Sequence, residues 1–154
     1  MLRATSSVVM EIRAATATEL VPVLDLLERC ALPVMGLSDH VDTLLVADNG
    51  TRVVGSAALE LHGDNALLRS VAVDASARGK GLGQRLTLAA LDLARSRGTR
   101  DVFLLTTTAE TFFFRFGFEP AERTNVPDAV RQSVEFTSAC PASAVVLRKH
   151  LDTQ

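Results

Sequence analysis

The first half of the chain shows the alternation of apolar and polar residues that is typical of β-strands. Residues 8–13 alternate, and residues 43–46, 52–61 and 66–73 are three further runs rich in β-forming side chains. Asn49-Gly50 separates the first two of these runs, and both of its residues tolerate the positive φ of a tight hairpin turn. The pattern therefore predicts a first strand followed by an antiparallel meander of three strands.

Two other segments place apolar residues at helical spacing. Residues 16–19 fit a capping box at the start of a helix, and leucine and valine recur at helical positions over 20–27. Residues 83–97 form a second amphipathic stretch, and Gly98 is suited to end it. Each helix should place one apolar face on the predicted sheet.

The second half of the chain carries the elements that complete this sheet. Residues 102–106 are almost all apolar, as in a buried strand, a short helix is predicted over 109–116, and the last strand over 144–148. Strand, loop, helix and strand over 67–106 form a βαβ unit, which requires two parallel neighbours. We therefore predict an α/β (α+β) fold with a mixed sheet. The length of 154 residues and the lack of a linker predict one domain over 1–154.

Charge and composition narrow the partners and the location. The chain has 16 basic and 18 acidic residues, so it lacks the basic excess on which nucleic acid binding depends. Apolar residues make up 47% and the mean hydropathy is +0.22, which excludes a disordered chain. No signal peptide or apolar run of about 20 residues is present, so we expect a cytoplasmic protein that binds no membrane. We further expect a monomer or a homodimer. The cysteines and histidines are scattered, which predicts no metal site.

The loop after the third run of the meander carries the most informative chemistry. Gly79, Gly81 and Gly83 alternate with other residues where a strand passes into a helix, and Arg78 and Lys80 add positive charge. Free amide N–H groups at a helix start and glycines without Cβ atoms favour binding of a phosphate group. The loop lacks the Ser or Thr of a Walker motif and the last small residue of a dinucleotide-binding motif. An ordinary tight strand-to-helix turn is the alternative interpretation.

Residues 78–83, Arg-Gly-Lys-Gly-Leu-Gly, follow the strand end Val-Ala-Val and resemble the acyl-CoA loop of GCN5-related N-acetyltransferases (GNATs). A short aromatic helix that ends in Phe-Gly-Phe at 116–118 resembles the second motif of that family. The resemblance implies a mostly antiparallel sheet of six to seven strands flanked by helices, with an acyl-CoA cleft between two splayed parallel strands. It implies acetyl-CoA as the co-substrate, held by Val71, Ala72, Val73, Arg78, Gly79, Lys80, Gly81, Leu82, Gly83, Gln84 and Phe113.

Within this family, residues 104–109 and the Phe-rich helix are similar to the acetyltransferase domain of N-acetylglutamate synthases. The tail over 140–144 is similar to a branch associated with arsenic-resistance operons. The resemblance implies an N-acetyltransferase that acts by direct attack of the amine of a small or amino-acid-like molecule, with a link to arsenic resistance. The synthases' basic pair is not recognisable, so glutamate is not carried over as substrate. A non-catalytic acyl-CoA-binding regulatory module is the alternative.

The catalytic groups of this chain depart from the family pattern. The family's general acid is often a tyrosine, but the chain has none and that position is Phe113; the position often occupied by Asn is Thr106. Glu60 is our candidate base, with a solvated strand-end carboxylate as the alternative. Arg69 either binds an acidic substrate group or pairs with a neighbouring carboxylate. Cys140 is either a soft ligand for arsenic or a packed cysteine.

Overall fold

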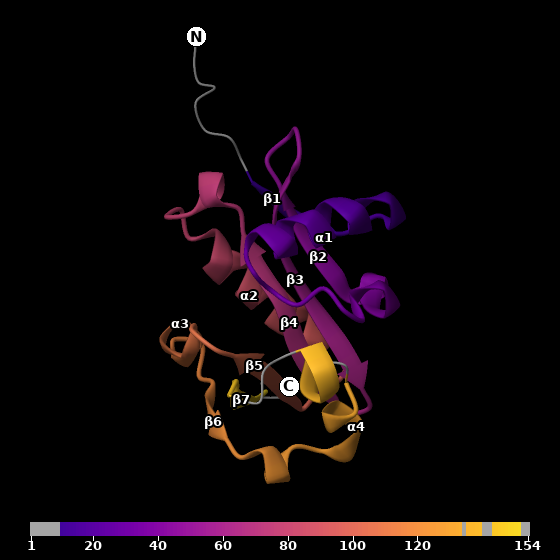
Figure 1. The fold of residues 1–154 in the computed structure, drawn as a ribbon, viewed down its shortest axis with the longest axis vertical. Helices are drawn as coiled ribbons and strands as arrows, with labels where there is room; N and C mark the ends of the chain where they lie inside the picture. Colours follow the sequence, from indigo (N-terminus) through magenta and orange to yellow (C-terminus); the bar gives the residue numbers. More distant parts are fainter. Residues whose placement is uncertain (1–9, 134, 140–142, 152–154) are drawn as a thin grey trace.

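A single seven-stranded sheet organises the computed structural model, which describes residues 10–133, 135–139 and 143–151 (Figure 1). The strands lie in the order β1-β2-β3-β4-β5-β7-β6, with the bounds β1 Glu11–Ala14, β2 Leu44–Asp48, β3 Val53–His62, β4 Asn65–Val73, β5 Asp101–Thr106, β6 Glu119–Ala121 and β7 Val145–His150. Strands β4 and β5 are parallel, and the other neighbours are antiparallel. The predicted mixed, mostly antiparallel sheet is confirmed.

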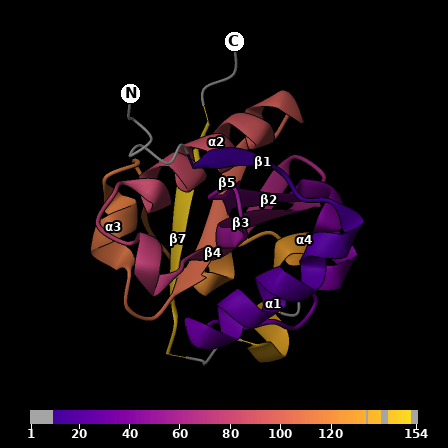
Figure 2. The same cartoon turned by 90° about the horizontal axis from the view of Figure 1, so that it is seen from above.

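Helices cover both faces of this sheet (Figure 2). Helix α2, Leu82–Ser96, packs on one face, and helix α1, Leu20–Arg29, packs on the other. Two shorter helices, α3 Glu110–Phe114 and α4 Asp128–Arg131, follow β5 and β6. Short 3₁₀ and π-helical segments complete the chain: η2 Ala17–Glu19, η3 Leu37–Thr43, η4 Ala75–Ala77, η5 Arg123–Asn125 and the π-helical η6 Glu135–Ala139. No helix in these described ranges is long and apolar enough to cross a bilayer.

Strand alternation separates the buried side chains into two layers. On β3, Ala57 and Leu59 belong to the core under α2, whereas Ala58 between them belongs to the core under α1. Successive side chains of a strand point to opposite faces, and both faces of β3 are covered by helices. Apart from Ser56, this strand therefore buries only glycine and apolar residues until it reaches Glu60, which is buried on the α1 side of the sheet by the same alternation.

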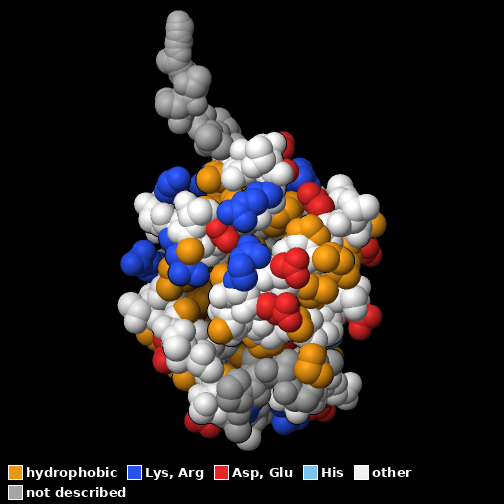
Figure 3. Space-filling view, turned by 45° about the horizontal axis from the view of Figure 1, so that its top comes forward, with side chains coloured by type: hydrophobic (Ala, Val, Ile, Leu, Met, Phe, Trp, Pro, Cys, Tyr) orange, Lys and Arg blue, Asp and Glu red, His pale blue; other side chains and the backbone are white. Residues whose placement is uncertain are grey.

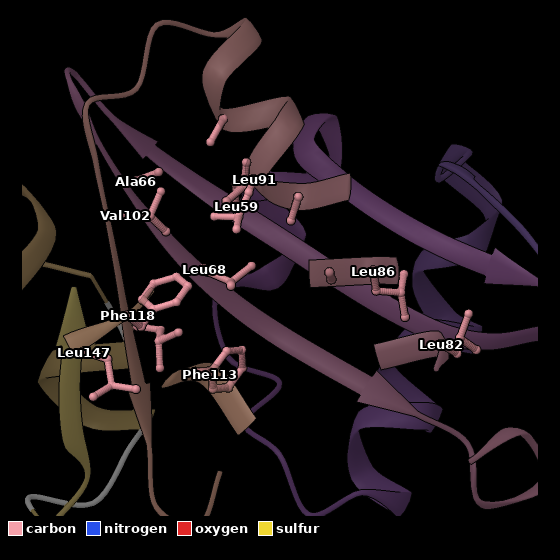
Figure 4. Packing of buried hydrophobic residues seen from close by; sticks show 14 of the residues in the cluster. Leu59, Ala66, Leu68, Leu82, Leu86, Leu91, Val102, Phe113, Phe118 and Leu147 are labelled. Atoms are coloured by element: carbon pink, nitrogen blue, oxygen red, sulfur yellow. The ribbon is translucent and has the colours of Figure 1, made fainter. Parts of the chain in front are cut away.

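Leucines of α2 fill the core on its side of the sheet. Leu82, Leu86 and Leu91 lie over the strand side chains that Figure 4 shows from close by. Gly55 of β3 allows this approach, because a Cβ atom there would lie 2.8 Å from the Leu86 side chain. Burial of one leucine of this kind contributes about 1.5–3 kcal/mol. The core therefore holds the start of α2 close to the start of β3 and the end of β4.

The structure differs from the predicted bounds mainly at the ends of elements. Strand β1 covers Glu11–Ala14 instead of 8–13, and residues 8 and 9 lie outside the described residues. Helix α3 ends at Phe114, two residues before the predicted end. The predicted hairpin is confirmed at Asn49, whose side-chain oxygen accepts hydrogen bonds from the amides of Thr51 and Arg52. Helix ends are set by local capping bonds, which hydrophobic spacing alone does not show.

Candidate functional site

A cleft opens where the parallel strands β4 and β5 separate. The two strands pair only from Asn65 to Leu67 on β4 and from Asp101 to Phe103 on β5. Beyond these pairs lies a cavity of about 410 Å³, lined by Ala31, Leu32, Pro33, Leu68, Arg69, Ser70, Val71, Leu104, Leu105, Thr106, Thr107, Thr108, Ala109, Phe113, Glu135 and Ala144. The splayed parallel strands expected from the sequence resemblance are therefore present.

A β-bulge at Ser70 turns β4 away from regular pairing at the mouth of this cleft. Ser56 pairs with Ala72 and Ala58 pairs with Arg69, so β4 holds one extra residue, and Ser70 has a φ of +59°. This φ is uncommon for a residue with a Cβ atom, and bulges bend the strand that carries them. The hydroxyl of Ser56 donates a buried 2.7 Å hydrogen bond to the carbonyl of Ser70. This bond holds the bulge in place.

The glycine-bearing loop forms a second hollow at the end of β4. Gly79 and Gly81 have φ values of +81° and +74°, and Gly81 precedes the first residue of α2. None of the amides of residues 79–84 donates to an acceptor in the part of the chain that the structure describes. The hollow measures about 280 Å³ and is lined by Val73, Ala77, Arg78, Gly79, Gly81, Leu82, Gly83, Gln84, Phe112 and Arg115. Free amides and the helix dipole make it suited to an anion.

Most of the residues predicted to bind acyl-CoA line either the cleft or the neighbouring hollow, with two exceptions. Val71 lines the cleft, and Val73 and the loop line the hollow, but Lys80 lies outside both linings and Ala72 is buried in the core under α1. The guanidinium of Arg78 donates to the carbonyl of Val73 at 3.0 Å. Figure 3 shows Lys and Arg side chains gathered on the upper left of the visible face, where the loop lies in Figure 1.

Asp74 fixes the start of this loop. Its carboxylate accepts hydrogen bonds from the amide and the hydroxyl of Ser76, and it forms ion pairs with Arg29 at 2.9 Å and Arg52 at 3.2 Å. The bonds from Ser76 and then from Arg29 hold the pKa of Asp74 well below its ordinary value. Asp74 is therefore ionised at neutral pH and joins α1, the β2–β3 hairpin and the loop.

Three buried charges lie on the α1 side of the cleft. Arg69 is fully buried, its Nη1 donates to Glu60 Oε2 at 2.9 Å, and its Nη2 lies 3.5 Å from Glu135 Oε2. That Nη2 makes no hydrogen bond within the described residues. Arg69 and Glu135 line the cleft, whereas Glu60 does not. The alternative in which Arg69 pairs with a neighbouring carboxylate is thus observed.

Glu60 faces a different hollow from the one that the strands open. With His40 and His62 it lines a cavity of about 350 Å³, and its Oε1 lies 3.1 Å from Nε2 of His62. Burial acts to raise the pKa of Glu60, but hydrogen bonds from Ser133, Arg69 and His62 outweigh it and hold that pKa below its ordinary value. Glu60 is 2% exposed, so it is not a solvated carboxylate. Its role as a base stays a prediction.

Thr106 and Phe113, the positions where the family often has Asn and Tyr, lie on the β5 side of the cleft. The hydroxyl of Thr106 accepts a 2.9 Å hydrogen bond from the amide of Ala109, and the ring of Phe113 packs edge-on against Phe118. Both residues line the cleft. Cys140 lies outside the described residues. Within those residues no group of three His, Cys, Asp or Glu side chains is placed to hold a metal ion.

Sequence reasoning missed Glu135. This residue lies in a segment without hydrophobic periodicity, and the fold returns that segment to the cleft through α4 and η6. The available signal was a lone carboxylate between Val134 and Phe136, which many surface segments also have.

Comparison with known proteins gives a consistent result. The family model described as an acetyltransferase (GNAT) domain matches residues 40–120, more than half of the chain. No curated protein matches the chain.

Several solved structures share the fold. A Mycobacterium tuberculosis protein, Rv2747, solved with CoA and NLQ, is 26% identical with a TM-score of 0.77, covering 92% of this chain and 99% of its own. N-acetylglutamate synthase from Neisseria gonorrhoeae, solved with coenzyme A and L-arginine, is 23% identical with a TM-score of 0.77 over 92% of this chain. The match covers 33% of the synthase, so this chain spans about a third of that protein.

Proposed function

Because this chain belongs to the GNAT family of acetyltransferase domains, we propose that it transfers the acetyl group of acetyl-CoA to the amine of a small or amino-acid-like molecule. The observation that carries the proposal is that the hollow with the free amides of residues 79–84 neighbours the cleft that β4 and β5 open: Val73 and Phe112 line the hollow, and Val71 and Phe113 line the cleft. An anionic diphosphate suits the amides, and an extended thiol arm suits the unpaired edge of β4. No other described part of the chain combines these features.

The residues present fit this co-substrate in chemical terms. The amides of residues 79–84 would hold the diphosphate, and the backbone of Val71 and Val73 would pair with the pantetheine arm. When bound, acetyl-CoA supplies an activated thioester. Direct transfer gains much of its rate from positioning of the amine beside that thioester, so the lack of a tyrosine does not exclude catalysis. Solvent or a threonine near Thr106 would then return a proton to the leaving thiolate.

Arg69 is the group that we propose to bind an acidic part of the substrate. Its Nη2 is buried at the cleft and has no hydrogen-bond acceptor among the described residues, although it lies near Glu135. A buried donor without an acceptor costs free energy that an incoming carboxylate or phosphonate would recover. This favours an amino-acid-like acceptor over a simple polyamine. A link to arsenic resistance is a further proposal, which rests on the sequence resemblance alone.

A non-catalytic acyl-CoA-binding module is the second candidate. One observation favours it: the position often held by tyrosine is Phe113, whose ring packs against Phe118 and has no proton to donate. We also propose a single domain over 1–154, a cytoplasmic location, and a monomer or homodimer that binds no nucleic acid or membrane. These proposals are consistent with the charge and hydropathy of the chain.

The two functions are separated by one pair of measurements. Calorimetry measures acetyl-CoA binding, and thiol release measures turnover with glutamate, arsenic- and phosphorus-containing amino acids, and polyamines. Binding with turnover of an acid-bearing amine supports the transferase. Binding without turnover of any amine supports the module, and absence of binding overturns both.

A further inference from the structure

Two carboxylates contact the buried guanidinium of Arg69, and they lie on different sides of it. Glu60 lines the hollow that holds His40 and His62, whereas Glu135 lines the cleft between β4 and β5. Both are almost fully buried, at 2% and 4% exposure. An amine acceptor in the cleft would therefore meet Glu135 without passing Arg69.

The cation between the two carboxylates decides which of them can exchange a proton with the cleft. A guanidinium stays protonated in proteins, so Arg69 cannot pass a proton from the cleft to Glu60. Glu60 is also engaged by three donors that stabilise its ionised form. Glu135 is the carboxylate that shares the cleft lining with Ser70 and Val71, next to the bulge.

Local structure holds Glu135 in this place. Its amide donates to the hydroxyl of Ser133 at 3.1 Å, and its carboxylate lies 3.5 Å from Arg69. Ser133 also hydrogen-bonds the carboxylate of Glu60. The hydroxyl of Ser133 thus connects the backbone of η6 to the Glu60–Arg69 ion pair. This connection fixes the carboxylate of Glu135 relative to Arg69, the group that we propose to bind the substrate.

We propose that Glu135 takes the proton of the acceptor amine in the acetyl transfer, an inference that rests on the proposed function. An ammonium group in the cleft gives one proton to the Glu135 carboxylate and becomes a neutral amine. The nitrogen lone pair then attacks the thioester carbon, a C–N bond forms, and the C–S bond breaks with its electron pair leaving on sulfur. The second amine proton goes to that thiolate through solvent, and Glu135 returns its proton to water.

The test is the pH dependence of kcat/KM for an acid-bearing amine in wild type and Glu135→Gln. At pH 7 we expect the variant to lose about 100-fold or more, the usual contribution of a general base. An amine with a pKa near 10 becomes neutral in solution as pH rises, about tenfold per unit. The rate of the variant should therefore rise about tenfold per unit from pH 7 to 9 and approach the flatter wild-type profile.

Glu60→Gln is the matched control, because it removes the other carboxylate that contacts Arg69. It should raise KM for the acid-bearing amine with a profile parallel to wild type. An equal loss at all pH values in Glu135→Gln, or recovery at high pH in Glu60→Gln only, overturns the proposal. If Glu135→Gln does not fold, Glu135→Asp should show the same recovery at smaller amplitude, and its absence counts against us. A wild type that binds acetyl-CoA but acetylates no amine refutes the proposed function itself, and this inference with it.

Discussion

Glu60 on β3 and Arg69 on β4 form a buried ion pair of 2.9 Å between diagonal positions on the same face of the sheet. Glu60 lies opposite Leu67 and Arg69 lies opposite Ala58, so alternation brings both side chains under the segment that contains α4 and η6. Diagonal neighbours are within reach of long side chains. The sequence suggested Glu60 as a base and Arg69 as a substrate-binding group, but in the structure each neutralises the charge of the other.

This dependence predicts the result of removing the cation. Arg69→Met should lower the free energy of unfolding by about 3–5 kcal/mol, because it removes the buried cation that contacts the carboxylates of Glu60 and Glu135. Urea denaturation measures the loss. The double variant Arg69→Met, Glu60→Gln should be more stable than Arg69→Met alone, since one of the uncompensated charges is gone. Equal stability of the two would show that Glu60 does not need Arg69.

Gly83 provides a test of the anion hollow that leaves the backbone unstrained. A Cβ there would lie 3.4 Å from Phe112 and 3.7 Å from Val73, both of which line the hollow. Gly83→Ala should change stability by less than about 1 kcal/mol, since alanine is the better helix former. Acetyl-CoA affinity, measured by calorimetry, should fall about tenfold, which corresponds to about 1.4 kcal/mol.

Gly98 at the other end of α2 is the control for this variant. Its φ of +80° is costly for any residue with a Cβ atom, and no atom lies within 4 Å of that position. Gly98→Ala should therefore lower the melting temperature while acetyl-CoA affinity stays unchanged. Normal affinity in Gly83→Ala would refute our placement of the diphosphate.

A Gly81→Val substitution is harsher than Gly83→Ala because Gly81 has a φ of +74°. It should abolish acetyl-CoA binding, but it should also destabilise the start of α2, since β-branched residues are rare at this φ. Thermal denaturation alongside calorimetry separates the two effects. Retained affinity in a folded Gly81→Val protein would contradict the assigned site.

The lowered pKa of Asp74 predicts an acid-dependent loss of stability. The stabilisation is fully present above the ordinary aspartate pKa of about 3.9 and is lost as pH falls below it, since the unfolded chain takes up the proton first. Asp74→Asn should lower the free energy of unfolding at pH 7 by about 1.5–3 kcal/mol, the usual value for hydrogen bonds to a charged group. The difference between wild type and variant should shrink steadily as pH falls below about 3.9, and a constant difference would contradict this origin.

Ser56 should matter for both the fold and the cleft. Ser56→Ala removes the only hydroxyl that bonds the carbonyl of Ser70 among the described residues, at a cost of about 1–3 kcal/mol. Because that bond holds the bulge, we also expect a higher KM for acetyl-CoA. Thr43→Val is the matched control, since Thr43 likewise donates a buried hydrogen bond, to Leu59, away from the cleft lining. A KM rise in both variants would show a general effect of destabilisation.

Residues with regular spacing could be placed from the sequence, and this covers most of the sheet. The meander, the βαβ unit and helix α2 depend on hydrophobic period and on turn residues such as Asn49-Gly50, which act over a few positions. The loop at 78–84 was recognisable because glycine at a strand-to-helix turn has a specific backbone use. The roles predicted for its residues stay predictions.

The contacts of Arg69 with Glu60 and Glu135 could not be predicted from regular spacing. Contact between Glu60 and Arg69 depends on the pairing register of β3 on β4, which places the two residues at diagonal positions on the hairpin side of the bulge at Ser70. The position of Glu135 depends on how α4 and η6 return to the sheet, and no periodic pattern marks that path. Register shifts and irregular returns are tertiary effects that local patterns do not report.

The short pairing between β4 and β5 divides the sheet into two half-sheets that meet along a narrow seam. Strands β1–β4 form one half and strands β5, β7 and β6 form the other, with only three residue pairs joining them. A molecule bound in the gap would contact both half-sheets and restrict their motion relative to each other. Amide hydrogen exchange at residues 104–106 should therefore slow when such a molecule is bound, while exchange inside the β2–β3 hairpin stays the same.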